Sequence, residues 1–157
     1  MAPAATADAA DPLTALYRDR YAAMVRLAHL ITASNAVAPD LVQDAFLKVG
    51  PKLGHVDHPA AYLRTAVVNE CRSWIRRQAL ERRHQVAEDP PASLPPDIDE
   101  MWTALSQVSD RQRAALVLRF YEDLSLEEIA ATLDCPLGTA KSLVHRGLAS
   151  LKEVLGR

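Results

Sequence analysis

The sequence predicts an all-α protein: two small helical domains joined by a proline-rich linker, the second ending in a helix-turn-helix. Three observations support this. Apolar residues recur at helical spacing in several segments, and no stretch alternates long enough to propose a sheet. Ala and Leu dominate, while aromatic residues make up only 5%, which favours helices over strands. Four prolines between residues 85 and 96 interrupt any regular apolar period, and 157 residues suit two small domains.

The first domain is expected over residues 12–84, after a frayed tail at 1–11. A long amphipathic helix fits from Pro12 to about residue 32. Pro39 opens a second helix that Gly50 and the proline after it close, because proline is tolerated in a first turn. Pro59 opens a third helix, which continues into an arginine-rich end.

The second domain is expected over residues 97–157, after the linker at 85–96. Asp97 with Glu100 predicts the start of a short helix, because an acceptor side chain three residues before an acidic one forms a capping box. Ser109 with Gln112 predicts the next start. We expect the core face of that helix to consist of Ala115, Leu116, Leu118 and Phe120.

Residues 125–154 predict a helix-turn-helix. Ser125 and Glu128 form a third capping box, and the apolar positions of this helix follow helical spacing. Residues 134–138 contain Pro136 and Gly138, which end the helix. A second helix from about Thr139 would then present polar side chains outward, with chemistry suited to phosphates and base edges. A helical hairpin with a solvated polar face is the alternative for this segment.

Composition narrows the function classes. The formal net charge is −2, but six arginines between residues 64 and 83 precede an acidic stretch without Lys or Arg at 85–100. Cys71 and Cys135 lie far apart without zinc-ligand spacing, and there is no glycine-rich phosphate loop or nucleophile motif. We therefore expect no catalytic residues, no metal and no cofactor. No secretory signal and no membrane-spanning apolar run is visible, so a cytoplasmic location is expected.

Several motifs resemble a bacterial RNA polymerase sigma factor of the extracytoplasmic-function (ECF) group, which has only the second and fourth conserved sigma regions. The C-terminal match runs over residues 125–130, 135–142 and 145–146. In the N-terminal half, residues 40–49 are similar to the family's polymerase-binding helix, and residues 59–77 to its promoter-melting segment. Two independent motifs at the right separation are more specific than either alone.

The resemblance implies three sets of site residues. Those implied to bind core RNA polymerase are Asp40, Gln43, Asp44, Phe46 and Leu47. Those implied to contact the minus-ten element are Tyr62, Arg64, Asn69, Arg72, Trp74, Arg76 and Arg77. Those implied to read the minus-thirty-five element are Thr139, Lys141, Ser142, His145 and Arg146. From the residues alone, spacing favours a solvated helix face for the first set and a core position for Trp74.

The resemblance also implies its partners: core RNA polymerase, promoter DNA and, as a further option, an anti-sigma factor wedged between the domains. Three positions depart from the family pattern: Tyr62 replaces a frequent Trp, Leu143 a frequent Arg, and Gly147 the usual Ala. Leu143 would either meet a thymine methyl group or pack against a neighbour. Alternatives to a promoter-specificity subunit are a stand-alone helix-turn-helix regulator, an enzyme, and a sigma-like protein that has lost promoter use.

Overall fold

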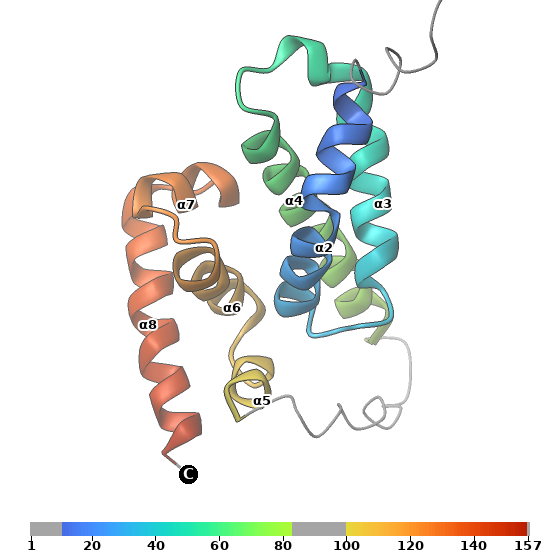
Figure 1. Cartoon of the computed structure of the whole chain (residues 1–157). Coiled ribbons are helices and arrows are strands. Elements are labelled where there is room, and N and C mark those ends of the chain that lie inside the picture. The colour runs from blue at the N-terminus through green and yellow to red at the C-terminus, as the bar shows by residue number, and fades with distance from the viewer. Residues whose placement is uncertain (1–10, 83–99, 157) are drawn as a thin grey trace, which may run out of the picture.

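The computed structural model describes residues 11–82 and 100–156, and every regular element in these ranges is helical. The N-terminal half packs three helices against one another (Figure 1). They are α2 (Pro12–Thr32), α3 (Ala38–Val49) and α4 (Pro59–Arg82), with a 3₁₀ segment, η1 (Gly50–His55), after α3. The predicted linker at 85–96 and most of the predicted tail lie outside the described residues, as does Asp97 of the first capping box.

The C-terminal half contains four α-helices and one π-helical turn. They are α5 (Glu100–Ser106), α6 (Asp110–Leu116), η2 (Val117–Tyr121), α7 (Leu126–Leu133) and α8 (Leu137–Leu155). Helix α8 packs along α6 and α7, on the side away from the N-terminal half (Figure 1). The helix-turn-helix predicted for 125–154 is therefore confirmed, although α8 begins two residues earlier than expected.

Local sequence signals explain most helix boundaries. Asp11 caps α2 by accepting a hydrogen bond from the backbone N–H of Leu13, and the predicted Ser109 cap accepts from Gln112 N–H. Ala33 ends α2 in the left-handed region, at φ 59°. In the described ranges no helix is long and apolar enough to cross a membrane.

One core prediction is wrong. Phe120 was expected on the buried face with Leu116 and Leu118, yet 61% of it is exposed. The reason is the π-helical turn η2, which changes the angular spacing of side chains after Leu116. Ala115, Leu116 and Leu118 are buried as expected.

The buried apolar residues form one cluster that includes side chains from both halves. Helix α2 contacts α6 and η2, and α4 contacts α7, so the halves lie side by side (Figure 1). From the proline-rich linker we predicted two tethered domains. Nothing in the sequence indicated that they would pack against each other.

Candidate functional site

The helix-turn-helix is built from two short-range devices. Ser125 Oγ accepts a hydrogen bond from Glu128 N–H at 3.1 Å, and the Glu128 carboxylate accepts one from Ser125 N–H at 3.2 Å. Hydrogen bonding of the Glu128 carboxylate, first by the backbone N–H of Ser125 and then by its side chain, holds the pKa of Glu128 below its usual range. Asp134 ends α7 in the left-handed region, at φ 53°, and Pro136 precedes the first turn of α8.

Helix α8 has a buried face and a polar face. Ala140, Val144 and Gly147 are buried against the rest of the C-terminal half. The four exposed polar residues predicted for the reading face are Lys141, Ser142, His145 and Arg146. Thr139 is half-buried beside them. The structure thus brings this predicted set together along one helix, α8.

Leu143 lies between these two faces. Its half-buried side chain packs against the hydrophobic cluster. Two roles were considered for this position: contact with a thymine methyl group, or packing against a neighbour. In this structure, without DNA, Leu143 packs against its neighbours.

Helix α4 divides the predicted minus-ten residues into two groups. Tyr62, Asn69 and Arg76 are exposed and recur every seven residues, so they share one face of the helix. Arg77 is exposed next to them, and Arg76 donates to Ser73 Oγ at 3.2 Å. An aromatic ring, an amide and two guanidinium groups on one surface are chemically suited to single-stranded DNA, through stacking and phosphate neutralisation.

The other three predicted α4 residues are not on this free surface. Arg64 faces Glu122 at 3.8 Å, and Arg72 donates to the carbonyl oxygen of Leu133 at 2.8 Å. Both acceptors belong to the C-terminal half. Trp74 is half-buried and packs against the hydrophobic cluster.

Helix α3 presents a contiguous exposed face at i, i+3, i+4 and i+7, formed by Asp40, Gln43, Asp44 and Leu47. Leu47 is 74% exposed, the largest exposure among the large apolar side chains of the described residues. Phe46, the fifth residue of the predicted set, is only 4% exposed and lies 5.0 Å from the ring of Tyr17. It belongs to the core and supports this face from behind.

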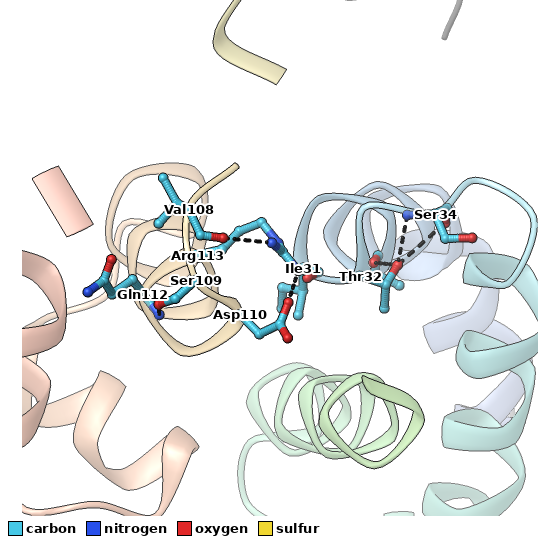
Figure 2. A network of polar contacts seen from close by, with 9 residues as sticks. Ile31, Thr32, Ser34, Val108, Ser109, Asp110, Gln112 and Arg113 are labelled. Atoms are coloured by element: carbon cyan, nitrogen blue, oxygen red, sulfur yellow. Dashed lines mark hydrogen bonds and ion pairs between the residues drawn. The ribbon is translucent and has the colours of Figure 1, made fainter. Parts of the chain in front are cut away.

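Sequence reasoning missed the residues that join the two halves. Arg113 is only 3% exposed, and it donates to the carbonyl oxygens of Ile31 and Val108 and to Asp110 (Figure 2). Arg26 donates to the hydroxyl of Tyr121 at 3.2 Å. The one sequence signal for this contact was an arginine within the apolar pattern of α6. That signal does not indicate which residue the arginine contacts, and its partner Ile31 lies 82 residues away.

Cys71 is not placed for nucleophilic chemistry, and neither cysteine belongs to a metal-binding group in the described residues. Cys71 is buried, and burial together with the nearby charge of Glu70 raises its pKa to about 12. Within residues 11–82 and 100–156, no group of three or more His, Cys, Asp or Glu side chains is arranged to hold a metal ion.

Comparison with known families assigns both halves. The model of sigma-70 region 2 matches residues 16–81, and the model of sigma-70 region 4 matches residues 104–153. An RNA polymerase sigma-E factor of Streptomyces coelicolor is 32% identical over 146 residues, covering 88% of this chain and 82% of the relative. The chain belongs to the sigma-70 family of RNA polymerase sigma factors, in its ECF group.

Other similarities agree with this assignment. The sigma factor CarQ of Myxococcus xanthus is 33% identical over 134 residues, which cover 78% of this chain and 77% of that one. Among solved structures, the sigma factor RpoE of Bartonella quintana, crystallised with the anti-sigma factor NepR, is 28% identical. It superposes with a TM-score of 0.74 over 91% of this chain and 96% of that chain.

Membership of the sigma factor family settles the function class. This ECF sigma factor directs core RNA polymerase to promoters and is not an enzyme. The stand-alone regulator would use the C-terminal helix-turn-helix alone, and the match to region 2 across the N-terminal half excludes it.

Proposed function

We propose a division of labour among three surfaces of this ECF sigma factor. The α3 face formed by Asp40, Gln43, Asp44 and Leu47 docks on core RNA polymerase. Its support is an unpartnered large apolar side chain beside two carboxylates, since exposed apolar residues rimmed by polar ones are typical of protein interfaces. Phe46 acts by holding this face from within the core.

Helix α4 binds the minus-ten element in its melted, single-stranded form. Tyr62 provides a stacking surface, and Asn69 contacts a base that has left the stack. Arg76 and Arg77 neutralise phosphates. Arg64, Arg72 and Trp74, which pack against the C-terminal half or the core in this structure, belong to the same proposed site. Because unstacking a base costs a few kcal/mol, about that much must be recovered from these contacts.

The polar face of α8 reads the minus-thirty-five element in the major groove. The exposure of four polar side chains on this one helix is the main support for the proposed function. Arg146 is suited to bidentate contact with guanine, and Lys141 to a phosphate contact. Thr139, Ser142 and His145 complete the face. The protein acts in the cytoplasm with polymerase. An anti-sigma factor is a further proposed partner, by analogy with the RpoE relative crystallised with NepR.

Reciprocal variants test the assignment of these surfaces. Arg146→Ala should weaken promoter binding by about tenfold to a hundredfold and relax the base preference at one position. Lys141→Ala should weaken binding to all promoters and lower the salt dependence by about one counterion. Both variants should keep the affinity for core polymerase. Lys152→Ala, an exposed lysine in the last turn of α8, is the matched control.

Asp44→Arg completes the reciprocal design: it should impair core binding and leave the fold and the α8 face unchanged. Asp19→Arg, the same charge reversal on an exposed position of α2, is its control. The measurements are co-purification with core polymerase and run-off transcription on fragments of the source genome. Equal transcription by the α8 variants and the parent protein would remove those residues from the reading face. Unchanged co-purification of Asp44→Arg would reject the docking assignment.

A further inference from the structure

A small cavity lies where α4, α6 and the end of α7 meet, and its volume is about 150 Å³. Each of the three helices contributes one apolar residue to its floor: Ile75, Ala114 and Leu133. Ala114 and Leu133 are buried, and Ile75 is half-buried. An apolar cavity of about this volume accommodates one six-membered ring. The space therefore fits a single ring that lies against an apolar floor.

Three arginines form the rim of this cavity. Arg72 and Arg76 lie one turn apart on α4, and Arg111 lies on α6. None of the three forms an ion pair with a carboxylate among the residues that the structure describes. Arg72 instead donates to the Leu133 carbonyl oxygen at 2.8 Å, and Arg76 donates to Ser73 Oγ at 3.2 Å. Both acceptors are neutral, so the three positive charges remain uncompensated.

The carboxylate that Asp110 contributes to the lining is already paired. Its Oδ1 accepts a hydrogen bond from Arg113 at 2.6 Å, and Arg113 is itself buried (Figure 2). The charge of Asp110 is therefore compensated from behind the cavity, and the rim keeps a net positive charge. Like charges held close together repel one another, and an anion between them removes this repulsion. Guanidinium groups suit oxyanions in particular, because their paired N–H donors match carboxylate and phosphate oxygens.

We propose that this cavity binds a small organic oxyanion that carries one ring, such as an aryl phosphate or an aryl carboxylate. The ring lies against Ile75, Ala114 and Leu133, and the oxyanion accepts hydrogen bonds from the guanidinium groups of the rim. The inference goes beyond the proposed function and does not depend on it, because it concerns a small-molecule ligand and not promoter DNA or polymerase.

Arg111 is the residue that distinguishes this site from the surfaces assigned above. It belongs to none of the three sets of polymerase-binding and DNA-binding residues. It is exposed, and it makes no hydrogen bond or ion pair within the described ranges. Its guanidinium is therefore available to a ligand without the loss of an existing contact.

The lining requires both parts of the ligand. An inorganic anion would compensate the arginines but would leave the apolar floor in contact with water. A neutral ring would cover the floor but would leave the three positive charges uncompensated. A ligand that joins the two should bind more tightly than either part. For phenyl phosphate we expect a Kd of about 1 mM, as is usual for so small a ligand.

NMR titration of the full chain tests the site with three probes. Phenyl phosphate contains both parts, while inorganic phosphate and phenol each contain one. Phenyl phosphate should shift the backbone amide signals of Ala114 and Leu133, and the other two probes should bind at least about tenfold more weakly. All titrations are made at one pH and one ionic strength, so that general screening of the arginines is the same throughout.

Variants of the rim and the floor locate the ligand. Arg111→Gln removes one guanidinium and should weaken phenyl phosphate binding by about tenfold, because a charge-assisted hydrogen bond is lost. Arg18→Gln, an exposed arginine of α2 that does not line the cavity, is the matched control and should bind like the parent protein. Ala114→Val fills part of the ring space and should weaken phenyl phosphate more than inorganic phosphate. Thermal melting checks that each variant is folded.

Equal phenyl phosphate affinity of Arg111→Gln and the parent protein would overturn the proposal, even if Ala114→Val does not fold. Inorganic phosphate binding as tightly as phenyl phosphate would also overturn it, because the apolar floor would then contribute nothing. So would signal changes confined to residues away from the cavity. These titrations contain neither DNA nor polymerase, and run-off transcription tests the proposed function separately. A failure of one is therefore distinguishable from a failure of the other.

Discussion

At the scale of single residues, Arg113 shows how this chain tolerates a buried charge. Its guanidinium is satisfied by two backbone carbonyls and by Asp110 at 2.6 Å. A buried cation without such partners would be strongly destabilising. Because one carbonyl belongs to its own half and the other to α2, the same side chain organises α6 and joins the halves.

The two cysteines should differ sharply in reactivity. Cys71 is fully buried with its pKa raised to about 12, whereas Cys135 is half-buried at the turn before α8. At pH 8 a thiol reagent should modify Cys135 at least about a hundredfold faster than Cys71, because only the thiolate reacts. Mass spectrometry after timed alkylation measures this ratio, and unfolded protein is the control in which both react.

The raised pKa of Cys71 also predicts alkaline destabilisation. The folded thiol keeps its proton to about pH 12, while the unfolded thiol loses it near its ordinary value of 9.0. The stabilising contribution is therefore complete below pH 9 and is lost as the pH rises from 9 toward 12. In the alkylation experiment described above, equal labelling of both native cysteines at pH 8 would contradict the burial of Cys71 on which both predictions rest.

The α3 set shows what residue patterns alone could decide. Helical spacing separates Asp40, Gln43, Asp44 and Leu47 from the apolar positions, so this face was predictable. Phe46 and Leu47 are adjacent, and adjacent helical residues point about 100° apart. Phe46 continues the apolar positions and packs against Tyr17, whereas Leu47 falls on the polar face and is exposed.

At the scale of helices, the signals that succeeded are local. The caps at Ser109 and Ser125 depend on residues three positions apart, so the sequence contains the whole interaction. No such local pair predicted the π-helical turn η2, which changes the angular spacing of the side chains after Leu116. The exposure of Phe120 was therefore not predictable from helical period.

Gly147 allows close contact between α8 and α6. A Cβ atom added there would lie 3.0 Å from Leu116 Cγ, and Leu116 is itself buried. Gly147→Ala gains about 1 kcal/mol of helix propensity, but overpacking a filled core costs about 1–3 kcal/mol. We expect a net loss of roughly 1 kcal/mol in the free energy of unfolding, measured by urea denaturation.

Gly138→Ala is the matched control for this change, because a Cβ atom there meets nothing within 4 Å and the residue also lies in α8. A stabilised Gly147→Ala variant would show that Leu116 moves aside. Adding Leu116→Ala should remove most of the penalty that Gly147→Ala causes, since the crowding partner is then gone.

At the scale of the whole molecule, the arrangement of the halves was beyond sequence reasoning. The two backbone contacts that define it join residues 61 and 82 positions apart, and a carbonyl acceptor leaves no mark in the sequence. The fold class and the surfaces of α3 and α8 follow from periodicity and motifs. The pairing of Arg64 and Arg72 with the other half follows from tertiary packing alone.

A shared core predicts cooperative unfolding. Because one buried cluster spans both halves, calorimetry of the parent chain should give a single transition with equal calorimetric and van't Hoff enthalpies. The double variant Glu122→Gln/Tyr121→Phe should resolve into two transitions, as the halves come apart before they melt. Two transitions in the parent protein would show that the contact between the halves adds little stability.

The position of Arg113 has a consequence for building chimeric sigma factors. Exchanging α5–α8 between relatives carries this guanidinium into a new host, whose first helix must end with an accepting carbonyl at the same place. If the first helix of the host were one turn shorter, the guanidinium would be buried between the two halves without this acceptor. Promoter specificity in such hybrids therefore depends on matching the host's helix length to the grafted arginine, as well as on the transplanted reading residues.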